Sequence, residues 1–132
     1  MLKSDDLAKL LLRLGVGFLI LFHGLTKISN GIDPVIGMVT AKGLPAFVAY
    51  GVYAGEVIAP IMVIIGLYTR PAALVIAVNM LFAFFLVHMG QLSSFSRSGG
   101  WVPELPALFL VGALAIFLGG AGKYCLNTPY NN

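Results

Sequence analysis

The chain has 132 residues, of which 59% are hydrophobic and only 10% are charged. A soluble domain has about 25% charged residues, so this sequence offers too little polar surface to coat a water-soluble globule. The formal net charge of +3 comes without any Lys/Arg cluster interleaved with aromatic residues, which argues against nucleic acid as a partner.

Four apolar segments follow one another along the chain, each of roughly the 20 residues that a bilayer core requires. They cover residues 7–28, 45–67, 71–89 and 102–120. Turn residues separate them: Asn30-Gly31 and Asp33-Pro34 break the chain after the first segment, and a short turn before Pro71 makes the second and third antiparallel neighbours. We therefore predict an all-α fold, an integral membrane four-helix transmembrane bundle that forms a single domain over residues 1–132.

The basic residues that flank these segments predict the orientation. Four crossings place both termini on one side of the membrane. The side with the termini has five basic residues, and the other side has three. The five are Lys3, Lys9, Arg13, Arg70 and Lys123, and the three are Lys27, Lys42 and Arg97. By the positive-inside rule, we predict that both termini are cytoplasmic.

The first segment carries two charges that are close together for a bilayer span. Arg13 and Lys27 are separated by about 20 Å of helix, against a hydrocarbon core of about 30 Å. One helical stripe holds Arg13, Gly17, Ile20, Gly24 and Lys27, with His23 beside it. The glycines would let a neighbouring helix approach closely. Two interpretations remain open, snorkelling side chains with packing glycines or a functional cluster.

Glu56 lies near the middle of the second segment, where an ionisable group is costly. Pro60, four residues later, cannot donate a hydrogen bond to the Glu56 carbonyl. Asn79 has a similar depth on the third segment, so we predict a hydrogen bond between Glu56 and Asn79. A ridge of small residues, Gly51, Gly55 and Ala59, is suited to close helix packing. Glu56 is interpreted either as a protonated structural group or as a group that handles protons or substrate.

Polar residues from all four segments fall in the membrane half opposite the termini. His23, Lys27, His88 and Glu104 occupy that half, and Glu56 lies at its floor. We predict that these five side chains converge on one pocket. The alternative is that each reaches the head groups separately. No metal site is expected, because Glu-x-x-His pairs and His pairs at i, i+4 are absent and Cys125 is the only cysteine.

The ordered set of these motifs resembles the DoxX family of small bacterial membrane proteins over residues 10–126. The closing segment departs from the family pattern, because Ala121, Cys125 and Asn127 stand where proline, serine and aspartate are usual. A role for the tail carboxylate therefore does not carry over. The matching pieces are Leu12-Arg13-Leu14, Phe22-His23-Gly24-x-x-Lys27, Gly43-Leu44-Pro45, Gly55-Glu56, Gly66-x-x-Thr69-Arg70, His88, Glu104 and residues 120–127.

The resemblance implies a multi-pass protein of the bacterial cytoplasmic (inner) membrane, a subunit of a redox-linked system such as quinone-coupled sulfur oxidation or an oxidative-stress assembly. The expected ligand is a quinone or another small amphipathic molecule. Any redox chemistry needs a bound cofactor or a partner such as a soluble oxidoreductase, because the sequence shows no electron carrier of its own. Whether the chain is itself an enzyme, a quinone-linked oxidoreductase subunit, is left open.

In that interpretation, seven residues take named roles. Glu56 and His88 are the candidate catalytic residues and exchange protons with the bound head group. Arg13 and Lys27 stabilise negative charge, and Glu104 orients His23 or His88. The candidate ligand-binding residues are thus Arg13, His23, Lys27, Asn79 and Glu104.

Two other classes of function stay open from the sequence. A non-catalytic membrane anchor or assembly factor would use the small-residue ridge and the loops to hold a soluble partner enzyme. A small transporter would need more than four helices and would therefore act as a homo-oligomer. The lipid bilayer is a partner in every case.

Overall fold

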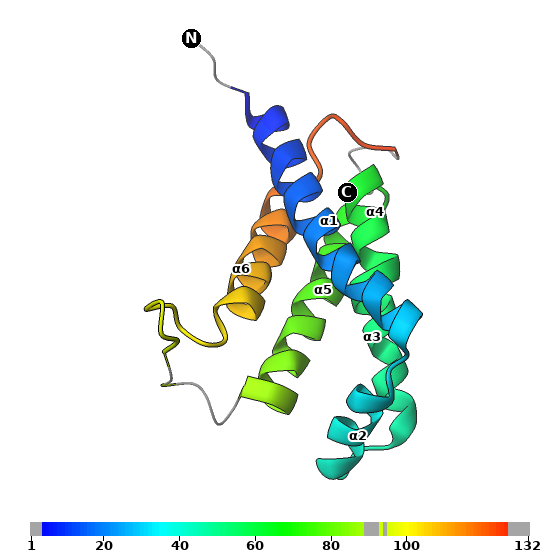
Figure 1. The fold of residues 1–132 in the computed structure, drawn as a ribbon. Coiled ribbons are helices and arrows are strands. Elements are labelled where there is room, and N and C mark those ends of the chain that lie inside the picture. Colours follow the sequence, from blue (N-terminus) through cyan, green and yellow to red (C-terminus); the bar gives the residue numbers. More distant parts are fainter. Residues whose placement is uncertain (1–3, 89–92, 94, 127–132) are drawn as a thin grey trace.

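The computed structural model describes residues 4–88, 93 and 95–126, and the side chains of residues 87 and 88 lie outside what it describes. Within these residues the chain is helical and has no strand longer than an isolated bridge (Figure 1). The order is α1 (Asp5–Asn30), α2 (Asp33–Ala41), η1 (Ala46–Tyr50), α3 (Gly51–Tyr53), η2 (Ala54–Ile58), α4 (Ala59–Ile65), α5 (Thr69–Ala83), η3 (Phe84–His88) and α6 (Glu104–Gly119).

Helix α1 has well-defined ends. The side chain of Ser4 accepts a hydrogen bond from the Leu7 amide at 3.2 Å, and Asp5 and Asp6 place negative charge at the positive end of the helix dipole. At the other end, the amide of Gly31, whose φ is 82°, donates to the Lys27 carbonyl. Only glycine adopts this backbone conformation readily, so the helix stops there.

The elements η1, α3, η2 and α4 run on as one apolar helical span of 20 residues, Ala46–Ile65. Its first turn is a 3₁₀-helix and η2 is a π-helical turn, in which the Ala59 amide donates to the Ala54 carbonyl. Gly66, in the left-handed conformation, ends the span and donates to the Met62 carbonyl. Helix α5 begins at Thr69, so α4 and α5 are antiparallel neighbours.

Three helical spans in the described residues are long and apolar enough to cross a bilayer: Asp5–Asn30, Ala46–Ile65 and Thr69–Leu86. Helix α6 is apolar but shorter, because its 16 residues extend over about 24 Å. The architecture is that of a helical membrane bundle. The number of four crossings and the side on which the termini lie stay predictions.

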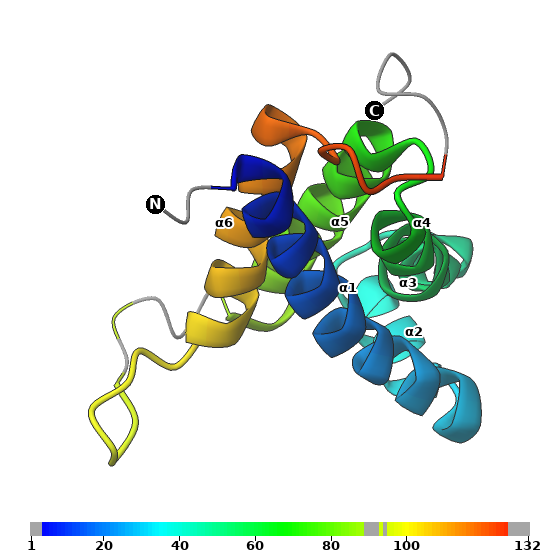
Figure 2. The same ribbon diagram turned by 90° about the horizontal axis from the view of Figure 1, so that it is seen from above.

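Helix α1 crosses the bundle between two helices. It packs against α4 and η2 on one flank and against α6 on the other, while α5 packs along both α4 and α6 (Figure 2). The start of α1 and the segment after α6 lie at the same end. There the Lys123 amide donates to Asp6 Oδ1 at 3.0 Å, and the Leu126 amide donates to the Ile65 carbonyl at 3.1 Å.

The buried core forms two clusters. Small side chains such as Ala73 and Ala113 let α1, α4, α5 and α6 pack closely around Ile20, Ile76 and Ile116 in the main cluster. The second cluster, centred on Ile32, Val39 and Ala49, joins α2 to the start of the second span.

The outer surface is strongly apolar. Leu118 on α6 is 77% exposed, Leu11 on α1 is 73% exposed and Phe47 on η1 is 73% exposed. A water-soluble protein rarely exposes so many large aliphatic and aromatic side chains, whereas lipid contacts make such a surface favourable.

Helix α2 is absent from the predicted set of helices. Asp33-Pro34 was expected to break the chain, but the structure has a nine-residue helix there. Proline has no N–H to lose in the first turn of a helix and its φ suits that position, so Pro34 begins α2 instead of interrupting the chain.

Candidate functional site

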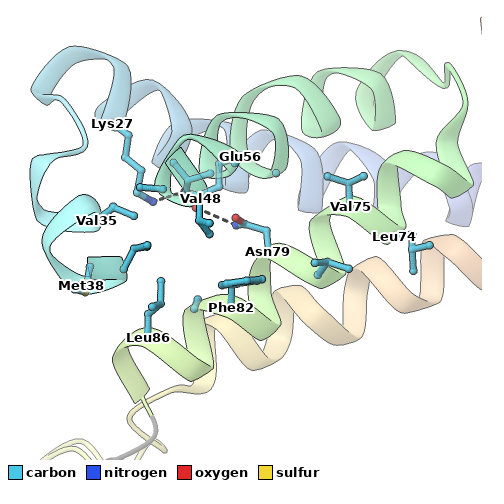
Figure 3. A pocket seen from close by; sticks show the side chains of 17 residues that line it. Lys27, Val35, Met38, Val48, Glu56, Leu74, Val75, Asn79, Phe82 and Leu86 are labelled. Atoms are coloured by element: carbon cyan, nitrogen blue, oxygen red, sulfur yellow. Dashed lines mark hydrogen bonds and ion pairs between the residues drawn. The ribbon is translucent and has the colours of Figure 1, made fainter. Parts of the chain in front are cut away.

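A polar cluster connects three helices in the interior of the bundle. Glu56 in η2 is 6% exposed, and both of its carboxylate oxygens have partners. Lys27 Nζ of α1 forms an ion pair with Glu56 Oε1, and Asn79 Nδ2 of α5 donates to Glu56 Oε2 at 3.0 Å. Figure 3 shows the side chains of Lys27 and Asn79 pointing toward Glu56 from opposite sides. The predicted Glu56–Asn79 hydrogen bond is therefore present.

Two glycines make this cluster sterically feasible. A Cβ at Gly24 would overlap the Glu56 carbonyl oxygen, so α1 and η2 touch through their backbones. A Cβ at Gly55 would lie 2.5 Å from the Asn79 Cβ and 2.6 Å from its Cγ. Any larger residue at either position would push apart the helices that carry Lys27, Glu56 and Asn79.

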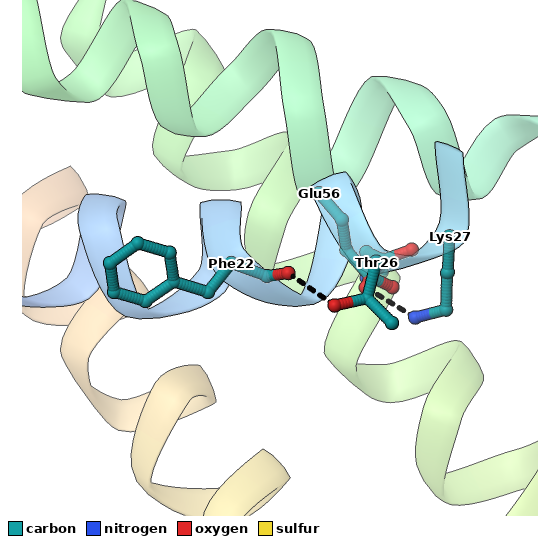
Figure 4. Close-up of polar contacts among 5 residues, drawn as sticks. Phe22, Thr26, Lys27 and Glu56 are labelled. Carbon is teal, nitrogen blue, oxygen red and sulfur yellow. Dashed lines mark hydrogen bonds and ion pairs between the residues drawn. The ribbon is translucent and has the colours of Figure 1, made fainter. Parts of the chain in front are cut away.

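The π-helical turn lies at the same place. Glu56 is the middle residue of η2, and Pro60 follows four residues later without an N–H to donate to the Glu56 carbonyl. A π turn inserts one extra residue into the helix and rotates the side chains that follow it, and such turns are frequent at functional sites. On α1, the Thr26 hydroxyl donates to the Phe22 carbonyl at 3.0 Å, next to the Lys27–Glu56 pair (Figure 4).

The three polar residues line a cavity of about 500 Å³. Apart from them, the walls are aliphatic and aromatic side chains and glycine backbone. Helix α2 supplies one wall, the second span another, and α5 with η3 the third. The lining residues besides Lys27, Glu56 and Asn79 are Val35, Met38, Val39, Val48, Ala49, Gly51, Val52, Gly55, Leu74, Val75, Val78, Phe82, Ala83 and Leu86.

The cavity reaches the outer surface of α5. Leu74, Val75 and Val78 line it, and each of these residues is more than 40% exposed. In a bilayer these apolar side chains of α5 would border the opening of the cavity. A polar wall inside and an apolar opening toward lipid together favour an amphipathic occupant.

Arg13 lies far from this cavity. Its Nε donates to the Val63 carbonyl at 2.9 Å and its two terminal nitrogens donate to the carbonyls of Ile64, Ala121 and Tyr124. Arg13 and Lys27 are 14 positions apart on α1, a rise of about 21 Å. The structure therefore does not place Arg13 where it could stabilise charge on a ligand in the cavity. The guanidinium instead joins the end of α4 to the segment after α6.

The predicted convergence of five polar side chains is wrong for His23 and Glu104, neither of which lines the cavity. The His23 ring packs edge-on against Phe109 of α6, with ring centroids 6.0 Å apart. His23 and Lys27 differ by about 40° around α1, and that offset directs one toward α6 and the other toward η2.

The Glu104 carboxylate is exposed beside Gly100, at the start of α6. The His88 side chain lies outside the described residues.

Sequence reasoning missed the wall that α2 contributes. Val35, Met38 and Val39 have the i, i+3, i+4 spacing of an apolar helix face, and Pro34 marks a helix start. Those two signals could have identified α2. In the part of the chain that the structure describes, no group of three or more His, Cys, Asp or Glu residues could hold a metal ion.

Comparison with known proteins agrees with this architecture. A sequence profile of the DoxX family matches residues 8–89. An uncharacterized protein of Haemophilus influenzae is 31% identical over 122 residues, which are 90% of this chain and 87% of that protein. "Putative oxidoreductase CatD" of Bacillus subtilis is 35% identical over 87 residues, which are 66% of this chain and 64% of that protein. No solved structure matches the chain significantly. The chain is a multi-pass membrane protein that belongs to the DoxX family.

Proposed function

We propose that this protein is a membrane subunit of a redox-linked system and binds a quinone, or a small amphipathic molecule of that kind, in the cavity between α2, η2 and α5. The observation that carries the proposal is the polar cluster of Lys27, Glu56 and Asn79 on the wall of an otherwise apolar cavity. A quinone has the matching distribution of polarity, with two carbonyl oxygens on a ring and an apolar tail.

The hydrogen-bonding groups suit both forms of such a head group. The Lys27 ammonium has further N–H groups, and Asn79 Nδ2 has a second hydrogen besides the one that it donates to Glu56. These are donors for a quinone carbonyl. The Glu56 carboxylate is an acceptor for the hydroxyl of the reduced quinol. Because Lys27 already neutralises Glu56, the cluster favours an uncharged head group over an anionic one.

The opening of the cavity suits the tail. A volume of about 500 Å³ is within the usual range for small-molecule sites, and it accommodates a ring with the first part of a side chain. The rest of the tail would leave between Leu74, Val75 and Val78 toward lipid. A ligand that enters from the bilayer does not have to cross water.

Reduction of a quinone consumes two electrons and two protons. The Glu56 carboxylate, paired with Lys27, would accept one proton from a bound quinol and return it to a quinone in the reverse direction. The second proton would exchange with water, and the electrons have to come from a partner, since the chain shows no carrier motif. A soluble oxidoreductase on the cytoplasmic side of a bacterial inner membrane would be such a partner. The name of the Bacillus subtilis relative, "Putative oxidoreductase CatD", supports a redox role.

The test is to purify the protein in a mild detergent and identify co-extracted small molecules by mass spectrometry. We expect about one quinone per chain, and cross-linking of a photoreactive quinone analogue to residues of the cavity. Asn79→Leu removes two donors and should weaken quinone binding about tenfold, the effect of one hydrogen bond of about 1.4 kcal/mol.

Glu104→Gln is the matched control, because it changes an acidic residue that does not line the cavity. The proposal fails if no quinone is retained and none competes with the photoreactive analogue. An empty cavity together with a tightly bound soluble protein would instead favour the anchor or assembly factor.

A further inference from the structure

A second hollow, of about 300 Å³, lies at the opposite end of the bundle from α2, where α1 begins and α6 ends. The charged residues that line it come from three separate parts of the chain: Asp6 and Lys9 of α1, Arg70 of α5, and Lys123 after α6. Residues 119–122 form the remaining wall. This hollow shares no residue with the cavity that contains Glu56.

The wall of residues 119–122 is almost bare backbone. It contains three glycines, and Gly120 and Gly122 both have a φ of 78°, in the region that favours glycine. A Cβ at Gly122 would lie 3.2 Å from Asp6 Oδ1 and 3.4 Å from the Lys9 Cβ. The segment thus lies flat against the first turns of α1. Arg13 holds it there through hydrogen bonds to the carbonyls of Ala121 and Tyr124.

The hollow has an excess of positive charge. Lys9, Arg70 and Lys123 surround it, against the single carboxylate of Asp6. Asp6 Oδ1 accepts the Lys123 backbone amide at 3.0 Å, and the ion pair found among the described residues is the distant Lys27–Glu56 pair. None of the three cations around the hollow is therefore neutralised by an ion pair within the described structure.

The surroundings of the hollow indicate which anion it would hold. Leu118, 77% exposed, directly precedes its glycine wall at the end of α6, and the hollow lies where α1 and α5 begin. In a bilayer the ends of these apolar helices lie at the level of the head groups, so the cations would lie there, next to the apolar surface of α6. Basic pockets between membrane helices bind anionic lipid head groups in this way. We propose that this hollow binds a phosphate group, carried by an anionic phospholipid whose acyl chains lie along α1 and α6.

Native mass spectrometry of the full chain in detergent tests this, with phosphatidylglycerol and phosphatidylcholine as matched probes. The wild-type protein should retain phosphatidylglycerol selectively. Each of Lys9→Gln, Arg70→Gln and Lys123→Gln should lower its affinity about fivefold, and the triple variant about 100-fold. Arg97→Gln, a change of an exposed loop cation, should have no effect. Asp6→Asn should raise the affinity about fivefold, because it removes the opposing charge and keeps an acceptor oxygen.

Equal retention of the two lipids, or unchanged phosphatidylglycerol binding in the triple variant, would overturn the proposal. Inorganic phosphate distinguishes the source of the anion. If it displaces no phosphatidylglycerol at millimolar concentration, the lipid assignment stands, and if it binds as tightly as the lipid, the assignment is wrong. If circular dichroism shows that the triple variant has lost its helicity, the phosphatidylglycerol affinities of the single variants and of Asp6→Asn test the proposal instead. The quinone content of the same preparations is an independent measurement.

Discussion

The carbonyl oxygen of Glu56 packs directly against the backbone of Gly24. Pro60 cannot supply the usual i+4 hydrogen bond to this carbonyl, and Gly24 has no side chain to keep a neighbouring helix away. A contact between two helices through their backbones results, and it brings Lys27, one turn further along α1, within reach of the Glu56 carboxylate.

Gly24→Ala should therefore destabilise the protein and weaken the Lys27–Glu56 pair. The added methyl group would overlap the carbonyl, so α1 would have to move, at a cost of about 1–3 kcal/mol. Thermal unfolding in detergent measures this. Gly15→Ala is the control in the same helix, because nothing lies within 4 Å of its Cβ position. It should stabilise the helix by about 0.5–1 kcal/mol. Equal effects of the two variants would contradict the proposed contact.

Lys27→Met should destabilise the protein more than the double variant Lys27→Met/Glu56→Gln does. The single change leaves a buried carboxylate whose remaining partner is Asn79, whereas a neutral glutamine at position 56 can keep the Asn79 hydrogen bond. We expect a difference of about 1–3 kcal/mol in the free energy of unfolding. A double-mutant cycle on unfolding midpoints gives the coupling, and simple additivity of the two changes would refute it.

Much of this site was predictable because burying an ionisable group in a membrane is costly. Glu56 at mid-depth needs a partner, and the third segment offers Asn79 at the same depth, so their hydrogen bond followed from sequence alone. The stripe of Arg13, Gly17, Ile20 and Gly24 on α1 is likewise buried.

The remaining features depend on how helices cross, which helical periodicity does not specify. His23 and Glu104 were expected in the cluster only because of their depth in the membrane. In the structure α1 lies between α6 and η2, so side chains on different faces of α1 contact different helices, and His23 contacts α6. The sequence places Arg13 on the same stripe as Lys27 and so suggests a role in ligand binding. Its actual partners are backbone carbonyls, which a sequence pattern does not reveal.

The orientation of the bundle is testable with its single cysteine. Five basic residues against three predict that the termini lie in the cytoplasm, so Cys125 should resist a membrane-impermeant thiol reagent in intact cells and react once the membrane is breached. Ser98 is exposed in the loop before α6, at the other end of the bundle. In a Cys125→Ser background, Ser98→Cys should react from outside. The reverse pattern of labelling would invert the assigned topology.

The guanidinium of Arg13 has a role that lysine cannot fill. It is almost fully buried and donates to four carbonyls, two at the end of α4 and two in the segment after α6. A lysine has a single nitrogen with three hydrogens and cannot span both pairs. Arg13→Lys should therefore release residues 120–126 from α4 and leave carbonyls without donors, which costs about 1–3 kcal/mol for each group left buried.

Cys125 reports on this release directly, because a Cβ at Gly66 would lie 2.7 Å from the Cys125 Cβ, so the thiol-bearing residue packs on the turn after α4. In Arg13→Lys, maleimide labelling of Cys125 in detergent should become several times faster than in the wild type. Arg97→Lys, the same substitution in an exposed loop, should leave the rate unchanged. An unchanged rate in Arg13→Lys, with a lowered unfolding midpoint, would mean that Arg13 stabilises α4 without holding the segment after α6.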